Sequence, residues 1–139
     1  MIEANDHRTR VDAWMGLVGK DAAPKRLLEV FEQGFGAVWR RAHATLGSVT
    51  LMAILDRVLY NAAERFPLLA PAEMDESGLR TDKLRERIDG LDRDSLEEAL
   101  RFILVEFLTV LGNLTAEVLT PALYSALATA EVPGEEAQS

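Results

Sequence analysis

Histidine and cysteine supply most metal ligands and many nucleophiles in proteins, and this chain is poor in both. It has two histidines, His7 and His43, and no cysteine. The lack of cysteine excludes disulfides, thiolate catalysis and cysteine-based zinc or iron–sulfur sites. Neither histidine belongs to a Glu-x-x-His or His-x-x-x-His pair, so the ligand spacing of di-iron and zinc-protease sites is missing. We therefore predict no metal, no cofactor and no catalytic residue, and we do not expect an enzyme.

Three other features have the residue types of chemical sites without the surrounding pattern. Gly34-Phe35-Gly36 has closely spaced glycines, but no Lys-Ser or Lys-Thr pair follows them as in a phosphate loop. These small residues more simply allow two helices to cross closely. Ser48 lacks the residues of a nucleophile elbow. Glu106 lies in an apolar stretch without an evident acid–base partner. It either has a function, or its carboxylate pairs with an arginine or faces solvent.

The segment around the second histidine resembles a known family. Arg40-Arg41-Ala42-His43-Ala44-Thr45-Leu46-Gly47-Ser48 is similar to the phosphorylatable helix of histidine phosphotransfer domains, which are also small helical bundles. That family has a basic residue three positions after the histidine and a glycine four positions after it. Here Gly47 matches, whereas Leu46 stands in place of the basic residue. The resemblance implies that His43 would accept a phosphoryl group; the alternative is a surface or packing histidine.

Charge and hydropathy restrict the partners that the chain can have. The sequence has 15 Lys and Arg against 23 Asp and Glu, a formal net charge of −8, which opposes attraction to nucleic acid and to anionic lipid. The longest apolar stretch, residues 102–111, covers only about half of the roughly 20 residues needed to cross a bilayer. Residues 1–8 are polar and mixed in charge, unlike a secretory signal. We expect no nucleic-acid or membrane partner and a cytoplasmic location.

The periodicity of the apolar residues predicts an all-α fold class, because they recur at helical spacing and no long stretch alternates as a half-buried strand does. At 139 residues the chain can bury one hydrophobic core. We predict a single domain over residues 1–130, a bundle of about five to six helices. A flexible acidic tail is expected over residues 131–139.

The first half of the chain predicts three helices. A short one covers about residues 11–18, and a second extends over about residues 24–46, with Pro24 in its first turn and Asp21 as a possible cap. A third follows and ends at Phe66-Pro67, because a residue before proline avoids the helical region. Residues 67–81 are irregular but apolar, so we expect them to pack on the bundle.

The second half of the chain predicts a short charged helix over residues 82–88 and then the hydrophobic centre of the fold. A helix is expected to begin near a capping box, at Asp94 with Glu97 or at Ser95 with Glu98. Its residues from about 99 to 111 are apolar on nearly all sides, so Leu104 and Leu108 should be buried. A last helix covers about residues 115–130, where Pro121 either bends it or marks its true first turn.

One internal repeat suggests how these helices connect. Leu46-Gly47-Ser48-Val49-Thr50 and Leu111-Gly112-Asn113-Leu114-Thr115 share the pattern Leu-Gly-(Ser or Asn)-apolar-Thr, and each lies between two helical stretches. Both glycines suit the left-handed residue that ends a helix, which predicts two helical hairpins with joints at Gly47 and Gly112. The alternative is that two long helices continue through each glycine at a cost of about 1 kcal/mol.

A surplus of apolar surface carries the functional prediction. Residues 49–60 and 99–111 place large apolar side chains on more than one helical face, more than a monomer of this size covers easily. Exposed apolar patches usually mark interfaces, and a two-fold homodimer is the commonest closed solution. We predict a regulatory or signalling protein–protein interaction module that forms a homodimer, with a larger protein partner possible. The alternatives are a histidine phosphotransfer domain that uses His43 and a helical sensor that binds an apolar ligand.

Overall fold

The computed structural model describes residues 4–18 and 21–130, and in this part of the chain it is a bundle of five α-helices with one small hairpin. The predicted all-α class is confirmed, whereas the predicted tail, residues 131–139, lies outside the described residues. The elements in chain order are α1 (Ala4–Val18), α2 (Pro24–Arg65), the 3₁₀ helix η1 (Pro67–Leu69), β1 (Glu73–Asp75), β2 (Gly78–Arg80), α3 (Asp82–Glu86), the 3₁₀ helix η2 (Ile88–Gly90), α4 (Arg93–Leu114) and α5 (Thr120–Ala128).

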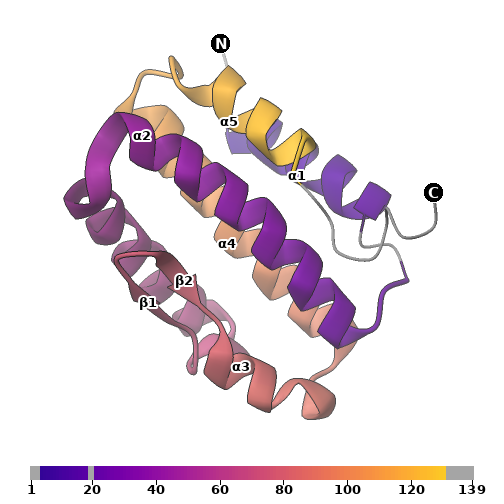
Figure 1. Cartoon of the computed structure of the whole chain (residues 1–139). Coiled ribbons are helices and arrows are strands. Elements are labelled where there is room, and N and C mark those ends of the chain that lie inside the picture. Colours follow the sequence, from indigo (N-terminus) through magenta and orange to yellow (C-terminus); the bar gives the residue numbers. More distant parts are fainter. Residues whose placement is uncertain (1–3, 19–20, 131–139) are drawn as a thin grey trace.

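Helix α2 is one long element with a break in its middle. It begins with Pro24 in its first turn, as predicted, but the predicted cap at Asp21 is wrong, because Ala23 is the N-cap residue and no side chain caps the helix. Gly47 has φ 82° and ψ 168°, which is not helical, so the chain turns back there and the second half of α2, residues 48–65, leaves in another direction (Figure 1). The predicted joint at Gly47 is confirmed.

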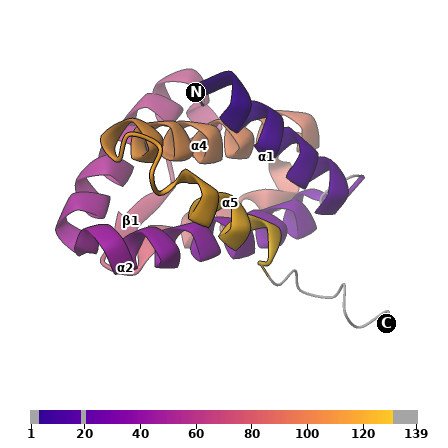
Figure 2. The same ribbon diagram turned by 90° about the horizontal axis from the view of Figure 1, so that it is seen from above.

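The core lies where α4 packs against α2 and α1 (Figure 2). Leu104 and Leu108 are fully buried, as expected for the hydrophobic centre of the fold. The Phe107 ring of α4 lies 4.9 Å from the Phe35 ring and 6.0 Å from the Trp39 ring of α2, centroid to centroid. These contacts hold the first half of α2 against α4.

The close crossing predicted at Gly34 is present. A methyl group added there would lie 2.6 Å from Cζ2 of Trp14 in α1 and 3.0 Å from a methyl carbon of Leu127 in α5. Helices α1 and α5 therefore both cover the first half of α2, and the missing side chain at Gly34 lets them approach.

The second predicted joint, at Gly112, is wrong. Helix α4 continues through Gly112 to Leu114, and the turn into α5 follows it. Gly112 is needed for space, because a Cβ atom there would lie 2.8 Å from Oε2 of Glu117. Glu117 and Ala116 take the left-handed conformation, with φ 64° and 52°, and the Glu117 N–H donates to the Gly112 carbonyl at 2.7 Å.

Of the predictions for the first turns of the last two helices, one is confirmed and one is wrong. Pro121 lies in the first turn of α5, which confirms one of its two predicted roles. The predicted capping box of α4 is wrong, because Asp92 is the N-cap and its carboxylate accepts from the Ser95 N–H at 3.0 Å. Asp92 also accepts from the Ser95 hydroxyl, and these two bonds lower the pKa of Asp92 below its usual value. The helix therefore begins at Arg93, before either of the two predicted starts.

The segment over residues 67–81 packs on the bundle, as predicted, but it contains a hairpin that was missed. In β1 and β2, Glu73 pairs with Arg80 and Asp75 with Gly78 in antiparallel register. Each strand has three residues, too few for alternation to be recognised. The hairpin packs against the first half of α2, where a methyl group added at Gly78 would lie 3.2 Å from the Trp39 indole.

By length and composition, α2 is the one helix among the described residues that could cross a membrane. Its two halves are divided at Gly47, carry charged residues such as Glu32 and Asp56, and both contribute side chains to the core.

Candidate functional site

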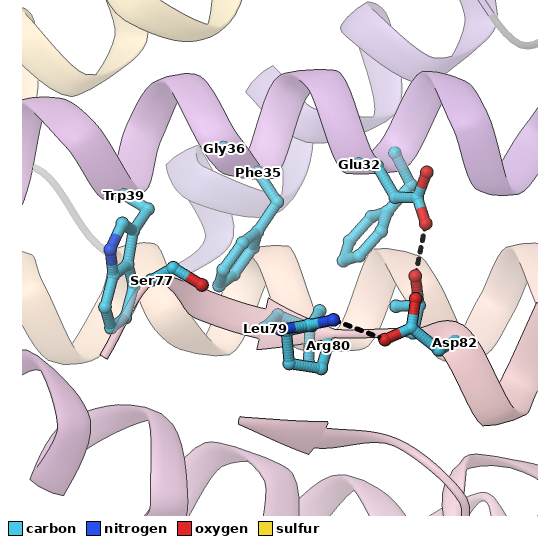
Figure 3. Close-up of a pocket in the computed structure, with 10 residues that line it drawn as sticks. Glu32, Phe35, Gly36, Trp39, Ser77, Leu79, Arg80 and Asp82 are labelled. Atoms are coloured by element: carbon cyan, nitrogen blue, oxygen red, sulfur yellow. Dashed lines mark hydrogen bonds and ion pairs between the residues drawn. The ribbon is translucent and has the colours of Figure 1, made fainter. Parts of the chain in front are cut away.

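A pocket of about 220 Å³ lies between the first half of α2 and the hairpin (Figure 3). Its wall on the α2 side is aromatic and its rim on the hairpin side is polar, so that it combines a stacking surface with charged groups. The volume is below the range of about 300 to 1,000 Å³ that is usual for small-molecule sites. The lining residues are Phe31, Glu32, Phe35, Gly36, Trp39, Ser77, Leu79, Arg80, Thr81 and Asp82.

The charged groups around this pocket already have partners. Glu32 accepts a hydrogen bond from the Thr81 hydroxyl (Figure 3). Its other carboxylate oxygen accepts one from Arg85 at 2.5 Å. Arg80 donates to Asp82 at 2.7 Å and to Asp75 at 2.8 Å. Both bonds raise the pKa of the Arg80 guanidinium, and the bond to Asp82 raises it more. These bonds fasten the hairpin and α3 to α2, and they leave this pocket without a free charge for a ligand.

A second polar cluster surrounds His7. This residue lies in the polar segment over residues 1–8, and the structure buries it to 1% exposure. Its Nδ1 lies 2.7 Å from the Tyr124 hydroxyl, and its Nε2 lies 3.6 Å from Oε1 of Glu117. The Thr120 hydroxyl donates to the same Glu117 oxygen at 2.5 Å. The cluster therefore joins α1 to α5 and to the turn before it.

The Tyr124 hydroxyl of this cluster stays protonated. Burial raises the pKa of Tyr124, the Glu117 and Asp6 carboxylates add to that, and the Arg10 guanidinium opposes it. The phenol therefore keeps its proton, and the tautomer of His7 sets whether the hydroxyl donates to Nδ1 or accepts from it. A phenol, an imidazole and a carboxylate in this order could relay a proton, but the imidazole is closed to solvent.

The sequence contained a signal for the burial of His7 that the prediction did not use. His7, Val11, Trp14 and Met15 are spaced as one helical face, and all four are buried. The first helix was expected to begin only near residue 11, because the residues before it are polar. Extending the pattern back by one turn would have placed His7 on the inner face.

Beside Tyr124, a groove of about 440 Å³ lies between α1 and α5. Its lining is mainly apolar, and its polar residues are Arg10 and Tyr124, whose ring lies 4.6 Å from the Arg10 guanidinium carbon. Its large apolar lining residues are Trp14, Leu17, Val18 and Leu127. The volume falls within the range of about 300 to 1,000 Å³ that small ligands occupy.

The residues that the sequence singled out do not form one site. His43 is exposed on the first half of α2, and Ser48 lies just beyond the turn at Gly47. Glu106 is half-buried on α4, where Asn61 donates to its carboxylate at 3.5 Å, so its partner is an amide and not an arginine. The glycine that carried the phosphotransfer resemblance forms the turn in α2, which explains Gly47 without chemistry.

The second half of α2 has two different faces. The inner face is buried and apolar and consists of Leu51, Ile54, Leu55, Val58 and Ala62. The opposite face is exposed and carries Val49, Ala53, Asp56 and Tyr60, spaced four, three and four residues apart; these four residues are the outer seam. Val49 is 84% exposed and Tyr60 is 64% exposed. This half of α2 lies at one edge of the molecule (Figure 2).

The charged residues of this face also differ from those near the hairpin. Asp56, Arg57 and Glu64 are exposed, and within the described ranges none of them forms an ion pair. On the hairpin, α3 and the start of α4, by contrast, Arg80, Lys83, Arg85, Arg93 and Arg101 all pair with carboxylates. The outer seam and its flanking charges are therefore one surface that the described part of the chain leaves unpartnered; the other exposed large apolar side chains there are Leu17, Leu114 and Val118.

Comparisons with protein-family models, curated proteins and solved structures found no match to this chain.

Proposed function

We propose that this protein is a regulatory or signalling interaction module that works as a homodimer, and that a larger protein is its further partner. One observation carries the proposal: large apolar side chains are exposed on the second half of α2, opposite a face that is already buried. Exposed large apolar residues that follow one helical face are typical of an interface, whereas scattered ones are normal. A self-complementary patch is satisfied most simply by a second copy.

The net charge of −8 opposes this association only weakly. Repulsion between two protomers is screened over about 8 Å at physiological salt, and burial of apolar surface does not depend on charge. A stable dimer needs an interface of at least about 1,000 Å² in total. Half-buried Met52 and Leu59, which flank the outer seam, enlarge the apolar surface.

Analytical ultracentrifugation over a micromolar concentration series tests the proposal. We expect a dimer that dissociates on dilution, and we expect Tyr60→Glu to shift the population to monomer because it places a charge inside the contact. Leu17→Glu is the matched control, since Leu17 is a similarly exposed apolar residue on α1. A monomer at every concentration, or equal loss of dimer in both variants, would contradict the proposal.

Phosphoryl transfer at His43 is a second candidate, supported by the exposure of this imidazole. Arg40 is also exposed one helical turn before His43, so a cation could reach a phosphate there although Leu46 occupies the position after it. Incubation with phosphodonor kinases should then give an acid-labile phosphate that His43→Gln removes. Unlabelled wild-type protein would end this candidate.

Binding of an apolar ligand is a third candidate, supported by the groove between α1 and α5. Native mass spectrometry of freshly purified protein should then show a bound small molecule. Trp14→Ala, which removes the largest apolar group of the groove, should release it, and a spectrum with only the bare chain mass would argue against it.

A further inference from the structure

We propose that two copies of this protein pair the second halves of α2 in antiparallel orientation, with a two-fold axis between Asp56 and Arg57. The inference rests on the proposed homodimer and adds its interface, its direction and its register. It starts from the outer seam, whose spacing of four, three and four residues is the repeat with which one helix faces another along a line.

Side-chain size fits this register where seam residues of the two protomers meet, at Ala53 and Tyr60; Val49, at the end of the seam, lies opposite the partner's Glu64. With the axis between Asp56 and Arg57, Ala53 of one protomer lies opposite the partner's Tyr60, and the symmetry repeats the contact. A small residue opposite a large one lets the phenol ring fill the space that the alanine leaves. A parallel pair in register would instead place Tyr60 against the partner's Tyr60 and Ala53 against the partner's Ala53, which crowds one level and leaves a gap at the other.

Charge selects the same direction. In the antiparallel register Asp56 faces the partner's Arg57, so the interface contains two pairs of opposite charge related by the axis. A parallel pair would place Asp56 against the partner's Asp56 at the centre of the contact, and like charges that face each other suppress such a pairing. Both residues are exposed and lack an ion pair among the described residues, so neither must break a bond within its own chain.

The chain has no cysteine, which makes disulfide trapping a direct test of the register. An oxidised mixture of Ala53→Cys and Tyr60→Cys proteins should form a mixed disulfide dimer. Ala53→Cys alone should not, because the two copies of residue 53 are about 10 Å apart along the helix axes and a disulfide spans at most about 7 Å between Cα atoms. A mixture of Ala44→Cys and Tyr60→Cys is the control, since Ala44 is exposed on the other half of α2.

A charge exchange provides an independent test by sedimentation. Asp56→Arg places two like-charged pairs at the axis and should raise the dimer dissociation constant at least about tenfold. The double variant Asp56→Arg with Arg57→Asp restores opposite charges with their positions exchanged, and it should recover the affinity of the wild type. Both variants change only exposed side chains, so their circular dichroism should match that of the wild type.

The possible outcomes separate the two proposals. Disulfide trapping by Ala53→Cys alone, with a wild-type dimer in the centrifuge, would overturn the antiparallel direction but keep the homodimer. A wild-type dimer that none of the seam variants traps or weakens would place the contact on another surface and overturn this inference. A wild-type monomer at all concentrations would overturn both the inference and the proposed function.

Discussion

The two halves of α2 have similar apolar content but different surroundings. The first half is covered by α1 and α5 at Gly34 and by the hairpin at Trp39, and its Glu32 is held by Thr81 and Arg85. The second half packs on the core through one face only, and the outer seam faces away from it.

This difference shows that apolar periodicity alone does not tell how many partners a helix has inside its own chain. In the first half, elements from both ends of the sequence return to cover several faces. In the second half the chain supplies no element for the outer seam within the described residues, and Val49 and Tyr60 stay exposed. Six substitutions and their controls test this contrast, from the largest expected effect to the smallest.

Phe31→Ala should have the largest effect, because Phe31 is fully buried and lies against Phe35 in the covered half. Loss of a buried phenylalanine ring destabilises a protein by about 3 to 5 kcal/mol. Urea titration monitored by circular dichroism would measure it. A loss below about 1 kcal/mol would mean that the first half of α2 is not covered as described.

Gly34→Ala should be the next largest, at about 1 to 3 kcal/mol, because the added methyl group meets the Trp14 indole. Gly16→Ala is the matched control, since a Cβ atom at Gly16 would meet no other atom within 4 Å. The control should be neutral or slightly stabilising in the same denaturant titration. Equal effects of the two substitutions would show that α1 and α5 do not press on α2 at this point.

Tyr124→Phe should destabilise the fold by about 1 to 2 kcal/mol, because it leaves Nδ1 of the buried His7 without its partner. The cluster holds α1 and α5, the two helices that cover the first half of α2. Tyr60→Phe removes the same hydroxyl group from an exposed ring and should change the free energy of unfolding very little. A similar loss of unfolding free energy in both variants would indicate that the bond between Tyr124 and His7 does not stabilise the fold.

Acid should weaken the hairpin that covers the first half of α2. The Ser77 hydroxyl, the Ser77 N–H and Arg80 lower the pKa of Asp75 below its usual 3.8 in the folded state. The stability from this carboxylate is therefore present above pH 3.8 and disappears as the pH falls through its lower folded value. Asp75→Asn should lower the melting temperature at neutral pH, and this difference from the wild type should vanish at strongly acidic pH.

Ser77→Ala gives a check on the cause of that shift. It removes the largest contribution to the low pKa of Asp75, so the titration of Asp75 followed by NMR should move up toward 3.8. An unchanged titration would assign the shift to the backbone N–H of residue 77, which alanine keeps, and to Arg80.

Tyr60→Ala should have the smallest effect on folding, within about 0.5 kcal/mol, when unfolding is measured at concentrations where the protein is monomeric. The Tyr60 ring is mostly exposed and contributes to the outer seam, not to the core. At higher concentrations the same substitution should lower the apparent stability, because association adds to the stability of the wild type. A large loss in the dilute monomer would mean that the ring packs within its own chain.

Local patterns were enough to determine the helical class, the ends of several elements and the central core. Proline fixes helix boundaries through its own geometry, so Pro24 and Pro67 were placed correctly, and Pro121 has one of its two predicted roles. The apolar surplus on residues 49–60 was visible because it is a matter of helical spacing alone. These features depend on residues within one or two turns of each other.

Tertiary structure decided the features that depend on distant residues. Gly47 and Gly112 stand in the same local pattern, yet one ends a helix and the other leaves room for the Glu117 carboxylate, because a glycine permits either role and the packing selects one. His7 became a buried partner of Tyr124, which is 117 positions away in the chain. The hairpin packs against Trp39, and a contact of this kind is needed because an isolated two-stranded hairpin is at best marginally stable.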